Sequence, residues 1–232
     1  MTRLLVSVVD SVEAAVAASQ GADLIDAKDP SQGALGALPA STVRAIKLSV
    51  PDYVTTSAVA GDDEDVDRLA ASALEIARTG MTFVKLGLTR ATATQDVIKT
   101  LGRRLEGRGR FIAVLFADEG PKISLLPILT RAGFAGAMLD TRNKISGRLR
   151  DVLAPDQLAG FISECRQQGL MCGLAGSLRI EDIPILARLS PDYLGFRGGL
   201  CRAGDRTGRL DPQAIQRAAG AVAAANGGDR AE

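Results

Sequence analysis

Short apolar runs recur along the chain, separated by longer stretches in which apolar residues return with a helical period. The short runs show little strict alternation of apolar and polar residues, which is typical of strands buried on both faces of a parallel sheet. We expect eight strands, at residues 4–9, 23–27, 54–59, 83–86, 111–116, 136–139, 171–174 and 193–196.

The stretches between these runs have the spacing of amphipathic helices. We expect eight helices, at residues 11–19, 39–48, 62–78, 92–105, 124–132, 155–168, 181–189 and 212–225. Four of them are followed by a glycine just before the next strand, namely Gly21, Gly80, Gly133 and Gly169. Glycine is favoured there because the left-handed conformation that ends many helices carries no Cβ penalty.

The regular alternation of strand and helix predicts an α/β fold. A doubly wound open sheet has the same alternation, but eight units in a chain of 232 residues favour a single (β/α)8 TIM barrel. We expect this barrel to form one catalytic domain over residues 1–226. The polar residues 227–232 are expected to form a frayed C-terminal tail.

The absence of histidine from the chain restricts the chemistry. It excludes Ser-His-Asp triads, Cys-His pairs, HExxH zinc sites and histidine bases. Proton transfer must therefore use Lys, Asp, Glu, Tyr or Cys. The three cysteines, Cys165, Cys172 and Cys201, lack metal-binding spacing and are expected to be reduced thiols, so we predict no metal site.

The net charge and the aromatic content give no reason to expect several classes of binding partner. The net charge of +1 gives no electrostatic reason to expect nucleic acid or an anionic membrane, and an aromatic content of 3% provides no stacking platform for single strands. The apolar run at 4–9 is too short for a membrane span. We expect a cytoplasmic protein, and the sequence leaves association into a homo-oligomer open.

Charged residues stand at the ends of several expected strands, where barrels carry their chemistry. Asp26 and Lys28 are two positions apart, so on an extended strand they point to one side. Lys85 interrupts an apolar run, Asp140 ends another, and Lys144 follows four residues later. Such charges are costly near a barrel interior unless they are paired, so we expect them to meet at one mouth. The alternative is that Lys28 and Lys144 are solvated loop charges and that Lys85 makes only a structural ion pair.

A cluster of lysines at one mouth would activate an amine. A free lysine has a pKa of about 10.4 and is protonated at neutral pH. Burial and neighbouring cations both favour the neutral amine, which can attack a carbonyl to form a Schiff base. This chemistry requires no histidine, metal or organic cofactor, so no cofactor is expected.

Glycines follow the last two expected strands, in the loops that commonly bind phosphate in a barrel. Gly176 and Ser177 follow one strand, and Arg197, Gly198 and Gly199 follow the other. Backbone N–H groups can surround an anion where side chains are absent, and a serine hydroxyl and an arginine fork add donors. The alternative is a pair of tight turns without a ligand.

An acidic pair, Asp118 and Glu119, follows the fifth expected strand. It could belong to the chemistry at the mouth. It could equally lie in the first turn of a helix, where carboxylates are favourable. The sequence leaves these alternatives open.

The chain resembles the (5-formylfuran-3-yl)methyl phosphate synthases over nearly its whole length. The resemblance is carried in order by LLVS at 4–7, GAD at 21–23, IDAKDP at 25–30, GALG at 33–36, VKLG at 84–87, AMLDT at 137–141 with Lys144, LAGSL at 174–178, GFRG at 195–198 and GDR at 204–206. It implies a TIM barrel related to class I aldolases. It further implies an enzyme that joins two glyceraldehyde 3-phosphates, with loss of water and one phosphate, to the furan precursor of methanofuran-type cofactors.

The resemblance also implies roles for individual residues. Lys28 maps onto the Schiff-base lysine of the family, and Asp26, Lys85, Asp140 and Lys144 map onto its supporting groups. In this interpretation Ser177, Gly198 and Gly199 hold one phosphate, and Lys144 or Lys85 neutralises the phosphate that departs.

Two other functions remain open from the sequence alone. One is a different aldolase or isomerase acting on phosphosugars, which needs a phosphate site but no convergent lysines. The other is a non-catalytic protein that binds a phosphate-bearing ligand.

Overall fold

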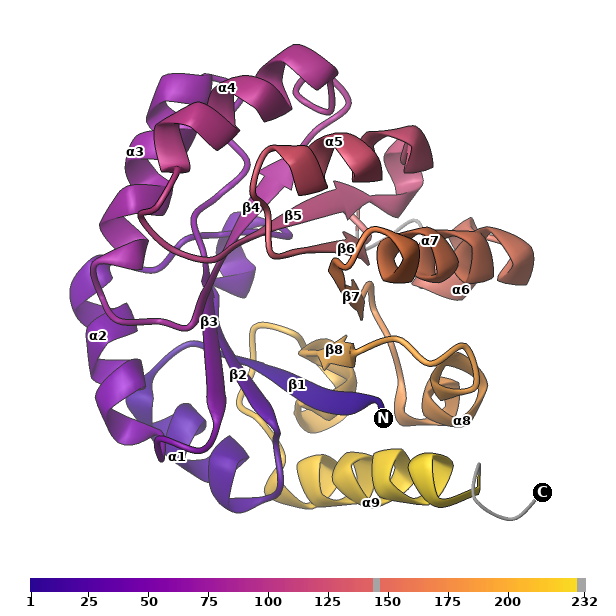
Figure 1. Ribbon diagram of the computed structural model, residues 1–232. Helices are drawn as coiled ribbons and strands as arrows, with labels where there is room; N and C mark the ends of the chain where they lie inside the picture. The colour runs from indigo at the N-terminus through magenta and orange to yellow at the C-terminus, as the bar shows by residue number, and fades with distance from the viewer. Residues whose placement is uncertain (144–146, 229–232) are drawn as a thin grey trace.

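The protein folds into a closed barrel of eight parallel strands that neighbour one another in chain order (Figure 1). This computed structural model describes residues 1–143 and 147–228. The strands are β1 (Arg3–Val8), β2 (Leu24–Ala27), β3 (Thr55–Val59), β4 (Phe83–Leu88), β5 (Phe111–Phe116), β6 (Gly136–Asp140), β7 (Met171–Leu174) and β8 (Tyr193–Phe196). β8 pairs with β1 and closes the ring, so the predicted TIM barrel is confirmed.

Helices surround the strands (Figure 1). They are α1 (Ser11–Ser19), α2 (Ala40–Ser49), α3 (Val66–Ala77), α4 (Gln95–Leu105), α5 (Leu126–Arg131), α6 (Leu149–Val152), α7 (Pro155–Gln167), α8 (Ile183–Ala187) and α9 (Pro212–Gly228). The expected left-handed glycines are present, because Gly21, Gly80, Gly133 and Gly169 all have positive φ.

Several helix boundaries differ from those expected. α3 begins at Val66 rather than at 62, because the Asp65 side chain accepts hydrogen bonds from the backbone N–H groups of Asp67 and Arg68 and caps the helix there. α6 has only four residues, too few for a periodic signal, and was not predicted. α9 continues through Gly228, so residues 227 and 228 of the expected tail are helical, while 229–232 lie outside the described residues.

Side chains of each strand alternate between the barrel interior and the surrounding helices. The outward set joins the apolar faces of the helices in the main core, with members such as Leu4, Ile25, Leu86, Leu139 and Leu194. The inward set forms a smaller apolar cluster that includes Leu5, Leu24, Phe83, Val114 and Tyr193. Asp26 lies two positions after Leu24, and Lys85 two after Phe83, so both charged side chains belong to the inward set.

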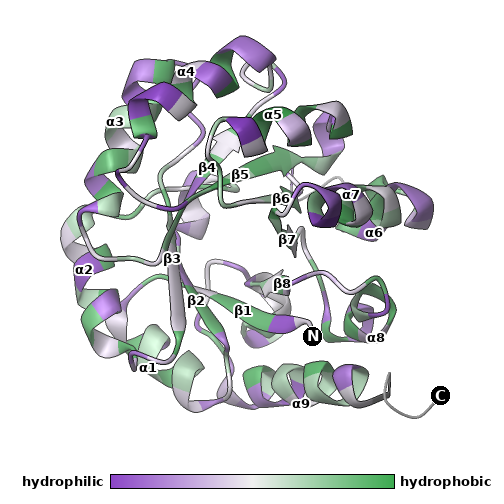
Figure 2. Cartoon of the chain, in the orientation of Figure 1, coloured by the Kyte–Doolittle hydropathy of each residue, from purple (hydrophilic) through white to green (hydrophobic). Residues whose placement is uncertain are grey.

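Hydropathy follows the same division. The strands are mainly hydrophobic, and hydrophilic residues are concentrated on the helices and loops around them (Figure 2). Within residues 1–143 and 147–228, no helix has both the length and the apolar character needed to cross a membrane.

Candidate active site

A cavity of about 540 Å³ opens where β1, β2, β4, β6, β7 and β8 end. Its lining includes Asp26, Lys28, Lys85 and Asp140, together with the glycine loops that follow β7 and β8. The described members of the predicted charged cluster therefore meet in one place. Lys144, the remaining member, lies outside the described residues.

Strand register places the Asp26 carboxylate between two hydroxyl groups. Ser7 of β1 and Ser57 of β3 both pair with Asp26 of β2 across the sheet. The Asp26 carboxylate accepts hydrogen bonds from Ser57 Oγ at 2.6 Å and from Ser7 Oγ at 3.2 Å. Burial acts to raise the pKa of Asp26, but the ammonium groups of Lys85 and Lys28 and the Ser57 hydrogen bond lower it overall.

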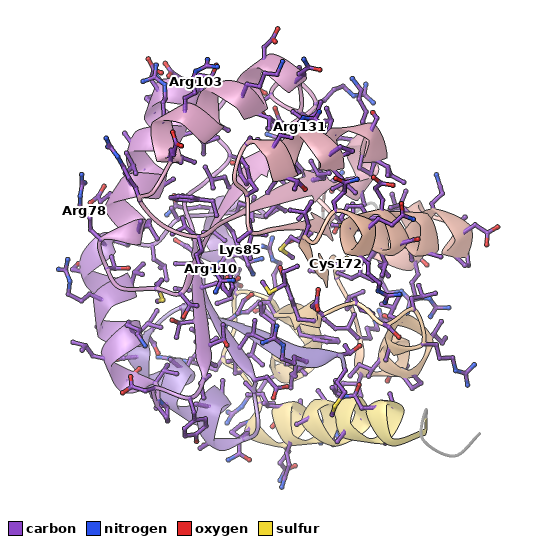
Figure 3. All side chains as sticks on the ribbon, in the orientation of Figure 1. Arg78, Lys85, Arg103, Arg110, Arg131 and Cys172 are labelled. Carbon is purple, nitrogen blue, oxygen red and sulfur yellow. The ribbon has the colours of Figure 1, made fainter. Side chains whose placement is uncertain are left out.

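Lys85 forms the deepest ion pair of the cavity. Its Nζ lies 2.9 Å from Asp26 Oδ1, and only 2% of each side chain is exposed. The ammonium also lies 5.5 Å from the centre of the Tyr193 ring, a favourable position for a cation. Figure 3 shows Lys85 within the ring of strands, whereas Arg78, Arg103 and Arg131 project from the helices. Burial lowers the pKa of Lys85, and the charge of Asp26 opposes this shift.

Lys28 and Asp140 form a second, looser pair. Lys28 Nζ lies 3.7 Å from Asp140 Oδ2, and 10% of the Lys28 side chain is exposed. Asp140 Oδ1 also accepts the backbone N–H of Thr141 at 2.8 Å. Because Lys28 is less tightly held and more exposed than Lys85, its amine is the more accessible of the two to a molecule in the cavity.

Glycines in both loops approach neighbouring segments too closely to carry side chains. A Cβ on Gly199 would lie 2.3 Å from the Leu178 carbonyl oxygen, and one on Gly176 would lie 2.9 Å from Thr141 Cγ2. Within the described chain, the backbone N–H groups of Gly176, Ser177, Gly198 and Gly199 donate to no protein acceptor. Unpaired N–H groups gathered at a cavity are a suitable environment for an anion.

The guanidinium of Arg197, which the sequence predicts to bind phosphate, donates to protein acceptors in this structure. Its guanidinium donates to the carboxylate of Glu13 and to the backbone carbonyls of Ser7, Arg206 and Gly208, so all five of its N–H groups are used. The guanidinium therefore has no donor left for phosphate and ties the β8 loop to β1 and α1. The sequence did not reveal this, because Glu13 lies 184 residues away.

Asp118 holds the loop that follows β6. Its two carboxylate oxygens accept the backbone N–H groups of Arg142 at 2.8 Å and Asn143 at 2.7 Å. Glu119, its neighbour in the 3-10 turn Ala117–Glu119, accepts from Arg142 Nη1 at 2.7 Å. Of the two alternatives left open by the sequence, the position in the first turn of a helix is confirmed, here a short 3-10 helix, and from there the pair anchors the loop beyond Asp140.

Some residues of the site were not singled out from the sequence, namely Ser7, Ser57, Tyr193 and Arg206. The serines lie at the level of Asp26 on neighbouring strands, a relationship that only the barrel register reveals. Arg206 lies in the GDR segment at 204–206, which carried the family resemblance without a chemical assignment.

Comparison with solved structures agrees with the barrel. Phosphoribosyl anthranilate isomerase from Thermotoga maritima superposes with a TM-score of 0.70 at 15% identity, covering 97% of this chain and 100% of that one. KGPDC from Streptococcus mutans has a TM-score of 0.68 at 14% identity, covering 97% of this chain and 98% of that one. At these identities the similarity supports the fold alone.

Comparison of sequences is more specific. A Methylorubrum extorquens protein, provisionally named a (5-formylfuran-3-yl)methyl phosphate synthase, is 50% identical over 99% of this chain and 94% of its own length. The synthase of that name from Methanopyrus kandleri is 35% identical over 95% of this chain and 99% of its own. The family model described as 4-HFC-P synthase matches residues 4–219. The chain therefore belongs to the 4-HFC-P synthase family.

Proposed function

We propose that the protein is a (5-formylfuran-3-yl)methyl phosphate synthase that condenses two molecules of glyceraldehyde 3-phosphate in the biosynthesis of a methanofuran-type cofactor. The atoms balance when the two substrates yield one furan aldehyde phosphate, one inorganic phosphate and two waters. Family membership and the names of the relatives support this activity. The site geometry supports a mechanism that uses lysine and aspartate alone.

Lys28 is the proposed nucleophile. Its amine lies in the cavity with Asp140 at 3.7 Å, and it is not enclosed like that of Lys85. The neutral amine attacks the carbonyl of the first triose phosphate, and loss of water gives the imine. Asp140 is positioned to take a proton from the amine and to return one to the departing hydroxyl.

Lys85 and Asp26 are the proposed proton-transfer pair. The imine withdraws electrons, so the carbon next to it can lose a proton to Lys85, whose lowered pKa makes its neutral form more accessible. The resulting enamine carbon forms the new C–C bond with the aldehyde of the second triose phosphate. Hydrolysis of the imine then frees Lys28 and restores the aldehyde of the first triose, onto which a hydroxyl of the second triose closes the ring. Loss of two waters and of the phosphate of the second triose gives the aromatic furan.

The glycine loops are the proposed site of one phosphate. The unpaired N–H groups of Gly176, Ser177, Gly198 and Gly199 can donate to phosphate oxygens, and the exposed Ser177 hydroxyl adds a donor. Arg197 contributes by fixing the β8 loop rather than by direct contact.

The single observation that carries the proposal is the meeting of the Lys28–Asp140 and Lys85–Asp26 pairs in one cavity of this family's barrel. The test is to incubate the purified protein with glyceraldehyde 3-phosphate and to follow the ultraviolet absorbance of the furan aldehyde, with product identity checked by mass spectrometry. Formation of a simple aldol or an isomer without furan would favour another phosphosugar enzyme. Thermal stabilisation by the substrate without turnover would favour a binding protein.

A further inference from the structure

Arg206 is a cation of the cavity that the mechanism above does not use. It lies in the loop between β8 and α9 and lines the cavity, and its side chain is half-buried. Its backbone carbonyl accepts Nε of Arg197, and Asp205 beside it forms a turn closed by the N–H groups of Thr207 and Gly208. The backbone of Arg206 is thus fixed by its hydrogen bond to Arg197, which is in turn held by the buried ion pair with Glu13.

The Arg206 guanidinium reaches from this loop to the loop that follows β2. Its Nη2 donates to the carbonyl oxygen of Gly33 at 2.8 Å. Gly33 follows the short 3-10 turn Pro30–Gln32, in the loop that begins at Lys28. The cation therefore lies against the loop after β2, whereas the unpaired N–H groups of the glycine loops follow β7 and β8.

Arg206 makes no ion pair with any carboxylate of the described residues. Four other cations that line the cavity are paired: Lys28 with Asp140, Lys85 with Asp26, Arg148 with Asp151 and Asp182, and Arg197 with Glu13. Arg179 is exposed beside Gly199, at the glycine loops. Within the described chain no carboxylate lies within 4.0 Å of Arg206, and its only hydrogen bond from the side chain is the one to Gly33.

We propose that Arg206 binds the phosphate of the second triose phosphate, the one that leaves during furan formation. This inference rests on the proposed function and assigns the second of its two phosphate subsites. A guanidinium with unused N–H groups in a partly buried cavity suits a phosphate dianion, which it can bind with two parallel hydrogen bonds. The same contact stabilises the negative charge that grows on phosphate as its C–O bond breaks, so that the electron pair leaves with the phosphate oxygen.

The surroundings of Arg206 agree with an anionic ligand. Burial lowers the pKa of its guanidinium, Asp140 opposes this shift across the mouth, and Arg197 adds to it. An incoming phosphate would offset both the burial and the repulsion from Arg197. The sequence suggested Lys85 as a cation that neutralises the departing phosphate, but its Nζ is paired with Asp26 Oδ1 at 2.9 Å.

The test compares wild type with Arg206→Ala, Arg206→Lys and the control Arg202→Ala, an exposed arginine of the same loop. Two steps are measured separately. Borohydride reduction at limiting glyceraldehyde 3-phosphate, followed by intact mass, reports the first imine. The initial rate of furan formation over a range of substrate concentrations reports the complete reaction, and unfolding midpoints report the fold.

We expect the amount of first imine trapped on Arg206→Ala to be within about twofold of that on wild type. The initial rate of furan formation at low substrate should fall about 100-fold, the loss typical of a hydrogen-bonded charge. The rate of furan formation by Arg206→Lys should lie between those of wild type and Arg206→Ala, because lysine keeps the positive charge without the two parallel donors of a guanidinium. Millimolar guanidinium should restore part of the Arg206→Ala rate, and Arg202→Ala should resemble wild type.

Two results would overturn the assignment. One is an Arg206→Ala rate of furan formation within twofold of wild type. The other is an equal loss of imine and furan, which would place Arg206 in the first subsite or in the support of the loop. A wild-type protein that forms no furan at all would instead overturn the proposed function, and with it this subsite.

Discussion

Lys85 Nζ and Asp26 Oδ1 lie 2.9 Å apart inside the barrel, and both side chains are almost completely enclosed. The pair is not isolated, because the Ser7 and Ser57 hydroxyls donate to the same carboxylate. Two opposite charges removed from water in this way depend on each other for stability. The catalytic proposal and the stability of the barrel are therefore linked at this pair.

Removing one partner of this pair should destabilise the protein. Lys85→Met leaves the Asp26 carboxylate buried without its cation and should lower the free energy of unfolding by about 3 kcal/mol. The double variant Lys85→Met/Asp26→Leu should recover most of this loss, because no buried charge remains. Urea unfolding measures both, and a double variant as unstable as the single one would contradict this explanation. Neither variant should form furan.

The Asp26 pKa predicts a particular response to acid. Because this pKa is lower in the folded protein than in the unfolded chain, the unfolded chain binds more protons as the pH falls below about 4. Stability due to Asp26 is thus present above that pH and is lost as the pH falls toward the folded-state pKa. In Asp26→Asn the acid slope of the unfolding free energy should be shallower by up to about 1.4 kcal/mol per pH unit. Identical acid slopes in the two proteins would refute this contribution.

The sequence predicted much of the site because its signals are local. Lys85 stands out within an apolar strand, and Asp26 and Lys28 share one face by simple alternation. The barrel followed from the repeated alternation of strands and helices, since β1 to β8 each have a local apolar pattern.

What the sequence could not predict depends on residues distant along the chain. Arg197 resembled a phosphate ligand until the fold brought Glu13 to it. Asp118 had no assignable task, because its partners are backbone N–H groups more than twenty residues ahead. The start of α3 is ambiguous in the sequence, because several acidic residues precede the helix and only Asp65 caps it.

The buried Arg197–Glu13 ion pair should contribute more to the free energy of unfolding than an exposed ion pair nearby. Glu13→Gln leaves the guanidinium buried without its counter-charge and should lower the free energy of unfolding by about 3 kcal/mol. The matched control is Arg209→Ala, which removes an exposed ion pair with Asp10 and should cost less than about 1 kcal/mol. Chemical denaturation of both variants checks this contrast, and equal losses would contradict it.

The reaction should require glycine at position 199, because there is no room there for a side chain. In Gly199→Ala the new Cβ would meet the Leu178 carbonyl oxygen, so the loops after β7 and β8 must separate. Displacement of the proposed phosphate site should lower kcat/KM for glyceraldehyde 3-phosphate roughly 10- to 100-fold.

Gly220→Ala provides the control, since the added Cβ contacts nothing and the residue lies on the exposed side of α9. It should leave kcat/KM unchanged and raise stability by up to about 1 kcal/mol. A Gly199→Ala protein with wild-type steady-state kinetics would show that the close approach of the loops is unimportant for the reaction.

The most direct measurement of the central claim is the position of the covalent adduct. Borohydride reduction in the presence of glyceraldehyde 3-phosphate, followed by proteolysis and mass spectrometry, should place a reduced triose phosphate on Lys28, and Lys28→Ala should form neither adduct nor furan. An adduct on Lys85 instead, or furan formation by Lys28→Ala, would contradict the account.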